Sequence, residues 1–290
     1  MDTWKAQVFL KAIDTGSLSK AARYFGYTPS GVSHMMDAFE GEIGFPLMIR
    51  TKQGVAPTQN GMKIIPLIRD ACGKDEQLSQ AISEIKGLAT GTLRISSYAS
   101  VASEWLPFVI AAFHKDFPHI RIDLFEGVWQ EVSSSLADHQ ADIGFYSYFP
   151  SIPYRWVPLK DDPMMVVVPP NHPLAHQSSV RVEQLEGETL IFPAYGVDVD
   201  VLRLIEGTNI KVEYNISTLY NYPAFRMVEQ NLGLVITNRL ITQGLNLNAA
   251  VLPIEPASSI ELGIAIPAES ESTPAVSRFV DYALHIIPTL

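Results

Sequence analysis

Residues 16–61 read GSLSKAARYFGYTPSGVSHMMDAFEGEIGFPLMIRTKQGVAPTQNG, and this stretch decides how the N-terminal part of the chain folds. Its apolar residues, with those of the segment before it, recur at helical intervals and predict short helices over residues 4–13, 17–25 and 28–43. Only Gly26 and Tyr27 separate the second helix from the third, as in a helix-turn-helix. Ser17 and Thr28 can cap the helices that they begin, and Pro29 suits a first helical turn because it lacks an amide proton.

Two further elements are predicted after the third helix. Short extended stretches on either side of Lys52, Gln53 and Gly54 indicate a small hairpin, or wing. Residues 58–88 then return to a helical pattern, with apolar residues at 64, 68, 71, 78, 82 and 85 in heptad spacing. Such a seam either pairs with a second copy of the helix or lies against its own domain. We favour pairing, because the seam continues beyond the N-terminal module.

The charge of the chain is divided unevenly along its length. The 290 residues have a formal net charge of −10, which by itself argues against a nucleic-acid partner. Residues 1–87, however, contain ten basic and nine acidic residues, whereas the remaining 203 contain 11 and 22. The acidity therefore belongs to the C-terminal part, and the helix-turn-helix is close to neutral.

The C-terminal part alternates predicted strands with helices. Strands are expected over residues 93–97, 120–126 and 143–147, with helices that end near residues 117 and 140. This order is typical of an open parallel α/β sheet, in which ligands bind in a crevice at the carboxyl ends of the strands.

The N-terminal segment resembles the winged helix-turn-helix of LysR-type transcriptional regulators. The resemblance rests on Gly16-Ser-Leu18 before Ala21-Ala22, the run from Thr28 to Glu40, then Ile43-Gly44, Leu47, Arg50 and Thr58-Gln-Asn-Gly61. It continues into the second half of the chain through Gly91-Thr-Leu-Arg-Ile95, Leu106 to Phe113, Ala141-Asp-Ile-Gly144, Val166 to Ala175 and Phe225 to Ile236. Recognisable pieces cover nearly the whole chain.

The resemblance implies a multidomain α+β protein. It consists of a winged helix-turn-helix DNA-binding domain over residues 1–58, a linker and dimerisation helix over 59–88, and a two-lobed α/β effector-binding domain of the periplasmic-binding-protein type over 89–290. Lobe one would comprise residues 89–161 and 267–290, and lobe two residues 162–266, joined by crossing segments near 160–165 and 263–267. The implied partners are double-stranded promoter DNA, a small-molecule effector and further copies of the chain in a homodimer or homotetramer.

Candidate DNA-contacting residues lie at the start of the third helix and on the wing. If that helix enters the major groove, its exposed N-terminal side chains meet base edges. Residues 28–39 contain no Lys or Arg, so phosphate contacts must come from elsewhere, with Lys5, Lys20 and Arg23 as secondary candidates. The predicted DNA-binding residues are Thr28, Ser30, Ser33, His34, Arg50 and Lys52.

Candidate effector-binding residues come from loops that follow the predicted strands. Hydroxyl and aromatic side chains dominate residues 97–100, 145–148, 192–195 and 218–222, and core packing is the better interpretation of Phe145 and Phe192. The resemblance places small-molecule contacts at the end of the first strand and on the hinge loops, which selects Ser97, Ser100, Tyr146 and Thr218. These loops contain no lysine, which favours a neutral or aromatic ligand.

Other functions find less support in the sequence. Ser17-Leu-Ser-Lys20 matches a motif for a catalytic serine nucleophile, but the partner motifs are missing. His172 and His176 have the spacing of two metal ligands on one helix, but Pro173 between them argues against a helix there. No metal, cofactor or enzymatic activity is therefore expected. Cys72 is interpreted as a small packed hydrophobe. No export signal or membrane span is recognised, which predicts a cytoplasmic protein. A solute-binding protein and a cleft enzyme remain the alternatives for the α/β part.

Overall fold

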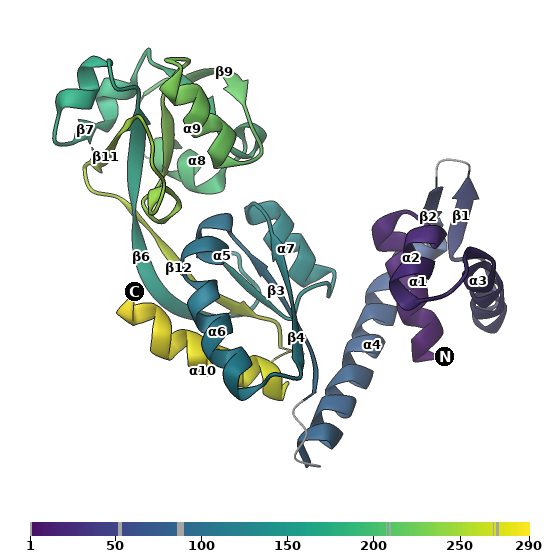
Figure 1. Cartoon of the computed structure of the whole chain (residues 1–290). Coiled ribbons are helices and arrows are strands. Elements are labelled where there is room, and N and C mark those ends of the chain that lie inside the picture. The colour runs from purple at the N-terminus through teal and green to yellow at the C-terminus, as the bar shows by residue number, and fades with distance from the viewer. Residues whose placement is uncertain are drawn as a thin grey trace. The chain divides into compact units, whose positions relative to one another are not determined.

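The structure is a computed structural model that describes residues 2–51, 54–85, 90–206, 208, 210–268, 270 and 273–290. The chain divides into two compact units, residues 1–91 and, apart from residues 137–140, residues 92–290. The division agrees with the change of charge near residue 87. Each unit is described below by itself (Figure 1).

The N-terminal unit contains the predicted helices and the wing. The helices are α1 (Thr3–Thr15), α2 (Leu18–Phe25), α3 (Pro29–Ile43) and α4 (Gln59–Ile85), and the antiparallel hairpin consists of β1 (Met48–Thr51) and β2 (Gly54–Pro57). Side chains of Asp2, Ser17 and Thr28 accept hydrogen bonds from the first amides of α1, α2 and α3. The predicted helix-turn-helix and hairpin are therefore confirmed.

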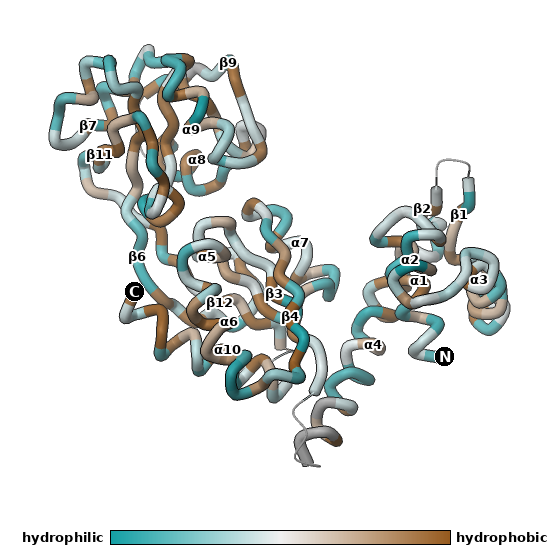
Figure 2. Tube along the Cα trace, viewed as in Figure 1, coloured by the Kyte–Doolittle hydropathy of each residue, from teal (hydrophilic) through white to brown (hydrophobic). Residues whose placement is uncertain are grey.

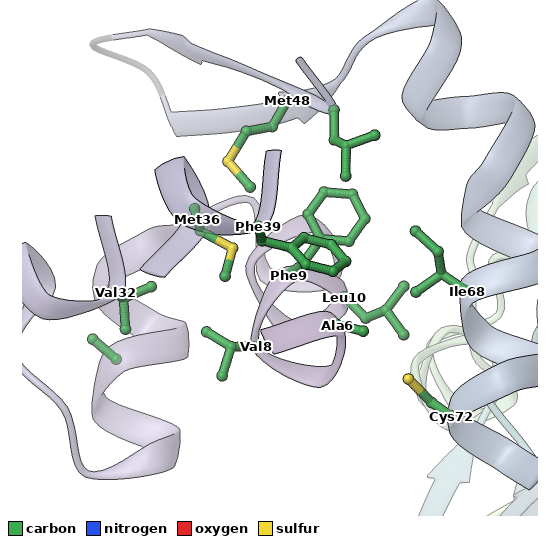
Figure 3. Close-up of a cluster of buried hydrophobic side chains, with 12 residues drawn as sticks. Ala6, Val8, Phe9, Leu10, Val32, Met36, Phe39, Met48, Ile68 and Cys72 are labelled. Carbon is green, nitrogen blue, oxygen red and sulfur yellow. The ribbon is translucent and has the colours of Figure 1, made fainter. Parts of the chain in front are cut away.

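The core of this unit lies where α1, α3 and α4 meet. Phe9 and Phe39 are fully buried, with ring centroids 5.8 Å apart, and Figure 3 shows them facing Ile68 of α4. Cys72 lies one turn further along α4, and its side chain is 8% exposed within the same cluster. The interpretation of Cys72 as a packed hydrophobe is confirmed.

The apolar seam of α4 is divided between two environments. Ile68 is only 4% exposed and packs in the core of its own unit, and Ile64 packs against the same cluster. Further along, Leu78 is 60% exposed and Ile82 is 43% exposed. Both interpretations of the seam thus have a physical basis: the first turns of α4 complete the domain core, and the later turns leave apolar side chains uncovered by the described part of this chain.

The C-terminal unit is built on a mixed sheet rather than the predicted parallel one. Its strands are β3 (Gly91–Ser97), β4 (Ile120–Glu126), β5 (Ile143–Ser147), β6 (Arg155–Val168), β7 (Val180–Arg181), β8 (Thr189–Phe192), β9 (Glu213–Ser217), β10 (Val235–Asn238), β11 (Ala250–Glu255) and β12 (Ser259–Ile266). Their order in the sheet is β4-β3-β5-β12-β6-β11-β7, with β10 also paired to β6 and with β8 and β9 paired separately. β3 and β5 are parallel, whereas β12 runs antiparallel to both β5 and β6.

Strand β6 passes through both lobes of this unit. Its residues 155–163 pair with β12, and its residues 164–168 pair with β10 and β11. Residues 262–265 of β12 pair with β5, and residues 259–263 pair with residues 158–163 of β6. The crossing segments near 160–165 and 263–267, and the lobe bounds that they imply, stay predictions.

Helices cover the strands of the C-terminal unit (Figure 1). They are α5 (Ala99–Glu104), α6 (Leu106–Asp116), α7 (Trp129–Ala137), α8 (Val199–Glu206), α9 (Asn221–Glu229) and α10 (Pro274–Ile286). The helix expected up to Phe117 is interrupted at Trp105. α10 packs on α6 through Phe113 and Phe279, whose ring centroids are 5.2 Å apart, so the chain end returns to lobe one as expected. Hydrophobic segments are concentrated in the strands (Figure 2).

Candidate functional sites

The start of α3 presents polar side chains on one exposed face. Thr28 Oγ1 accepts a hydrogen bond from the amide of Gly31 at 3.1 Å and lies 3.2 Å from Ser30 Oγ. Thr28, Ser30 and His34 are exposed, and Ser33 is partly exposed. Ser33 and His34 follow Ser30 by three and four residues, which places these three side chains along one side of α3, and Thr28 is the N-cap just before them. The structure thus brings together the four predicted residues of α3.

Arg50 joins the wing to this helix. From β1 its guanidinium donates to Ser33 Oγ at 3.0 Å and contacts the carboxylates of Asp37 at 2.7 Å and Glu40 at 3.2 Å. Glu40 also accepts from the amide of Met48 at 2.9 Å. Arg50 is therefore held against α3 and neutralises acidic side chains there, a role that the sequence did not predict because its partners are ten or more residues away. Lys52 lies outside the described residues.

The secondary basic candidates differ in their surroundings. Lys5 forms an ion pair with Glu42 and thus has a local surface partner. Lys20 and Arg23, on α2, are exposed.

A cavity of about 550 Å³ lies in the C-terminal unit, between its two lobes. Lobe one contributes the turn after β3 and the segment after β4, and lobe two contributes the starts of α8 and α9 with residues that follow β10. Its lining includes Tyr98, Ser100, Glu104, Glu126, Trp129, Gln130, Met164, Asp198, Asp200, Leu219, Tyr220, Asn221, Tyr222, Phe225, Thr237 and Ile241. The volume and the mixture of aromatic, aliphatic and a few polar side chains suit a small organic molecule.

The polar part of this cavity is acidic. Four of the lining residues are carboxylates, and none of the described lining residues is Lys or Arg. Asp198 Oδ1 accepts from the amides of Asp200 and Val201 at 3.1 Å each and so caps α8. Burial raises the pKa of Asp198 to about 6, and the charge of Asp200 adds to the effect. Burial also raises the pKa of Asp200, against the hydrogen bonds that it accepts.

Three contacts connect the two lobes beside the cavity. Tyr98, from lobe one, donates to Asp200 Oδ2 at 3.1 Å and lies 3.0 Å from Ser147 Oγ. The Nε2 of Gln130 donates to the carbonyl of Val197 at 3.0 Å. A third link comes from Arg203, which donates to the Tyr148 carbonyl at 3.0 Å. A ligand in the cavity would touch Tyr98, Asp200 and Gln130, and could therefore change how the lobes are held.

The structure brings one of the four predicted effector residues to the cavity. Ser100 is part of the lining. Ser97 is fully buried and donates to the Tyr98 carbonyl at 2.9 Å. Tyr146 is also fully buried, with its ring packed against Trp129 and Trp156. Thr218 lies outside the lining and donates to the Tyr220 carbonyl at 2.8 Å.

Three of the four predicted loops, 97–100, 192–195 and 218–222, contribute residues to the cavity lining, whereas 145–148 does not. The acidic residues Asp198 and Asp200 were missed, although the sequence Val197-Asp-Val-Asp-Val201 carries a signal: two acids within an apolar stretch after a predicted strand and loop. Trp129 and Gln130 follow β4 and were likewise not selected. Phe145 and Phe192 are buried, as expected.

The motifs that imitate catalytic sites have structural explanations. Ser17 Oγ accepts from the Lys20 amide at 3.3 Å as the cap of α2. His172 Nδ1 accepts from the amide of Leu174 at 3.3 Å, as the cap of a short 3-10 turn. Across the residues with assigned positions, His, Cys, Asp and Glu side chains form no cluster of three that could hold a metal ion. Likewise, no helix in the described ranges is both long and apolar enough to cross a membrane.

Comparison with known families accounts for nearly the whole chain. Residues 5–62 match the bacterial regulatory helix-turn-helix protein of the lysR family, and residues 86–286 match the LysR substrate binding domain. An uncharacterised HTH-type transcriptional regulator of Bacillus subtilis, YvbU, is 29% identical over 98% of both chains. The HTH-type transcriptional regulator LrrA of Synechococcus elongatus is 28% identical over 99% of this chain and 98% of its own.

Solved structures share the fold. A full-length OxyR variant from Pseudomonas aeruginosa superposes with a TM-score of 0.74 at 17% identity, over 98% of this chain and 94% of its own. The effector-binding domain of QuiR in complex with shikimate has a TM-score of 0.63 at 22% identity, over 69% of this chain and 98% of its own. Since the two family matches together span both units, the chain belongs to the family of LysR-type transcriptional regulators, with an N-terminal helix-turn-helix DNA-binding domain and a C-terminal effector-binding domain.

Proposed function

We propose that this regulator binds a partly symmetric promoter site through the exposed face of α3, and that its affinity for that site changes when an effector binds in the cavity. The observation that carries the proposal is the common exposed face of Thr28, Ser30, Ser33 and His34 at the start of a helix that follows a tight turn. A helix presented in this way can lie in the major groove, where its first residues reach base edges. From this role we infer a cytoplasmic location.

Arg50 neutralises acidic side chains on α3, which supports the proposal that this face of the helix binds DNA. Asp37 lies one turn after Ser33 and its side chain is 58% exposed, so its carboxylate would repel phosphates. The guanidinium of Arg50 at 2.7 Å compensates that charge. Direct phosphate contacts then fall to the exposed Lys20 and Arg23 of α2, together with Lys52 of the wing.

We infer that the regulator acts as a homodimer or homotetramer assembled in part through α4. Leu78 and Ile82 remain exposed at heptad spacing on the half of α4 that does not serve the domain core. Pairing would cover them and would present two α3 helices to two half-sites. Two linked modules of modest affinity gain strength by avidity, which a nearly neutral DNA-binding unit requires.

The effector would act through the lobes. Tyr98 and Gln130 of lobe one already reach Asp200 and Val197 of lobe two. A ligand that binds one arrangement of the lobes more tightly than another shifts the population toward it, and the coupling energy equals that difference in affinity.

Footprinting of DNA upstream of the regulator's own gene tests the proposal. We expect protection of two half-sites about one helical turn apart or a multiple of it, and His34→Ala should weaken binding by roughly 1 kcal/mol or more if His34 contacts a base edge. His114→Ala, an exposed histidine on α6, is the matched control and should leave protection unchanged. Absence of any protected site at low salt would reject the proposed promoter site.

A further inference from the structure

The polar atoms that line the cavity between the lobes indicate the chemical class of its ligand, which the volume alone does not. Within the described residues, four buried polar atoms of its lining side chains have no hydrogen-bond partner: Trp129 Nε1, Gln130 Oε1, Asp200 Oδ1 and Asn221 Oδ1. Such atoms are uncommon in folded proteins, and several around one cavity indicate polar groups that a bound molecule completes. Three of the four are hydrogen-bond acceptors.

Among these groups, Asp200 is expected to lower the stability of the fold most when it is unpaired, because it is a carboxylate. Its side chain is 8% exposed and lines the cavity. Oδ2 accepts from the Tyr98 hydroxyl at 3.1 Å, whereas Oδ1 has no partner in the described part of the chain. A buried carboxylate with one unsatisfied oxygen and no ion-pair partner destabilises the protein, so its presence at a ligand cavity needs a compensating donor.

Among the described residues, the other charged groups that line the cavity have the same sign, and the one basic residue whose charge acts on Asp200, Arg203, lies outside the lining. Asp198 lies two residues away from Asp200 in the same wall, and Glu104 and Glu126 complete the acidic lining. Arg203, the basic residue of α8, instead reaches the Tyr148 carbonyl and the ring of Phe149, 4.8 Å from its centroid. A carboxylate or phosphate ligand would therefore meet negative potential without a basic partner. A cationic ligand would be attracted by every charged group in the lining.

The apolar walls suit the remainder of such a ligand. Trp129, Tyr98 and Tyr220 contribute aromatic surface, and the faces of such rings attract organic cations. Resting on the proposed function, we propose that the effector is an organic amine with an apolar or aromatic body, whose ammonium group binds Asp200. Burial raises the pKa of both Asp198 and Asp200, although at Asp200 hydrogen bonds from Ser147 and Tyr98 and the charge of Arg203 act in the opposite direction.

Binding of an amine would act on the contact between the lobes. An ammonium group at Asp200 competes for, or shares, the carboxylate that Tyr98 of lobe one already contacts. The Oε1 of Gln130 can accept a second ammonium proton, since its Nε2 is occupied by the Val197 carbonyl. The ligand thus completes both inter-lobe links at once.

A matched set of probes tests the charge preference on the full-length protein without DNA. 2-Phenylethylamine, 2-phenylethanol and phenylacetate share an aromatic ring and differ in the terminal group. Thermal shift and calorimetry at neutral pH should show the amine binding on the order of tenfold or more tighter than the alcohol, because a desolvated charge pair contributes at least that much. The acid should bind more weakly than the alcohol.

The Asp200→Asn variant tests whether Asp200 is the residue that gives the cavity its preference for the amine. This change removes the charge and keeps the shape of the side chain and an acceptor for Tyr98, so the amine should fall to the affinity of the alcohol. Glu206→Gln, an exposed carboxylate on the same helix, is the matched control and should retain the preference. If Asp200→Asn did not fold, the wild-type comparison of the three probes would decide alone.

Three results would overturn the proposal: no response to the amine at millimolar concentration, equal or tighter binding of the acid, or an unchanged amine preference in Asp200→Asn. Because these measurements contain no DNA, they are independent of the footprint. A failed amine preference with a protected promoter would reject only the ligand class, and a confirmed preference without a footprint would reject only the regulator's proposed DNA site.

Discussion

At the scale of single residues, several side chains serve a neighbour rather than the partner that their type suggests. Arg50 is on the wing, where a basic residue would be expected to meet phosphate, yet its guanidinium contacts Ser33, Asp37 and Glu40. Its side chain is 31% exposed, so part of it remains accessible. The positive charge of Arg50 therefore acts first to neutralise the recognition helix.

Arg50→Ala should weaken binding to specific and non-specific DNA alike, because it leaves two carboxylates uncompensated beside the DNA. If neutralisation is the main role, adding Asp37→Asn should restore a large part of the affinity, and the salt slope should change little. If Arg50 contacts a phosphate directly, the slope should fall by about one and Asp37→Asn should not rescue. Fluorescence anisotropy across a salt series distinguishes the two roles.

Asp198 should make stability depend on pH in a defined direction. Its pKa is raised to about 6 from an ordinary value near 4, so the folded state binds its proton more tightly than the unfolded state does. This carboxyl therefore costs stability as pH rises from about 4 through 6, and the cost persists above that range.

Asp198→Asn keeps a capping side chain for α8 without the charge. The variant should be more stable than the wild type at pH 7.5, by up to ~3 kcal/mol, and the difference should shrink toward pH 4. Urea unfolding at several pH values measures this difference, and Glu206→Gln provides a control. A difference that is constant with pH would contradict the raised pKa.

At the scale of elements, α4 shows how one apolar pattern can serve two interfaces. Its first turns pack Ile64, Ile68 and Cys72 against the core built by α1 and α3. Arg69 is buried on the same side, with Nη1 3.2 Å from Asp14 Oδ2 of α1. In the later turns, Leu78 and Ile82 remain exposed. The heptad register continues across this boundary, with Asp75 at one of its seam positions.

Leu78→Glu should weaken self-association, because it places a charge in the seam that two copies would bury. We expect the apparent mass in sedimentation velocity to fall at concentrations where the wild type is associated, with little change in the melting temperature of the N-terminal unit. Met62→Glu, at a comparably exposed position on the same helix but off the seam, should leave the mass unchanged. Equal effects of the two substitutions would contradict pairing through this seam.

At the scale of the whole molecule, DNA binding and effector binding are assigned to different units, and these units differ in net charge. The acidic surplus lies in the part of the chain beyond residue 87, which includes an acidic cavity, and the DNA-binding unit is nearly neutral. We infer that the effector influences DNA binding through the arrangement of the lobes, because it binds in a different unit of the chain from the DNA. The contact between Tyr98 and Asp200 is the clearest link between the lobes of the effector-binding unit.

Tyr98→Phe should test that link. The change leaves the ring in place and removes the hydroxyl that donates to Asp200, so a buried carboxylate loses its donor at a cost of about 1–3 kcal/mol. We expect a lower melting temperature for the effector-binding unit and an altered effect of the ligand on DNA affinity, with the affinity of the ligand-free protein changed less. Tyr148→Phe, whose side chain is exposed, should reproduce neither effect.

The sequence by itself determined the helix-turn-helix, the wing, the two-lobed effector domain and the division of charge. The helix-turn-helix and the wing follow from local causes, namely helical periodicity and caps such as Ser17 and Thr28. The two lobes of the effector domain were implied by the resemblance to the LysR-type family. Three of the loops that border the cavity were also identifiable, since ligands collect at strand ends.

Only the tertiary structure decided which side chains meet. Two such contacts join residues from different elements: Arg50 with Asp37 and Glu40, and Asp200 with Tyr98. The burial of Tyr146 likewise depends on the rings that pack against it. Periodicity reports which face of an element is apolar but not what covers it. Hydroxyl-rich loops therefore predicted a neutral site, whereas packing placed two aspartates there and made the cavity acidic.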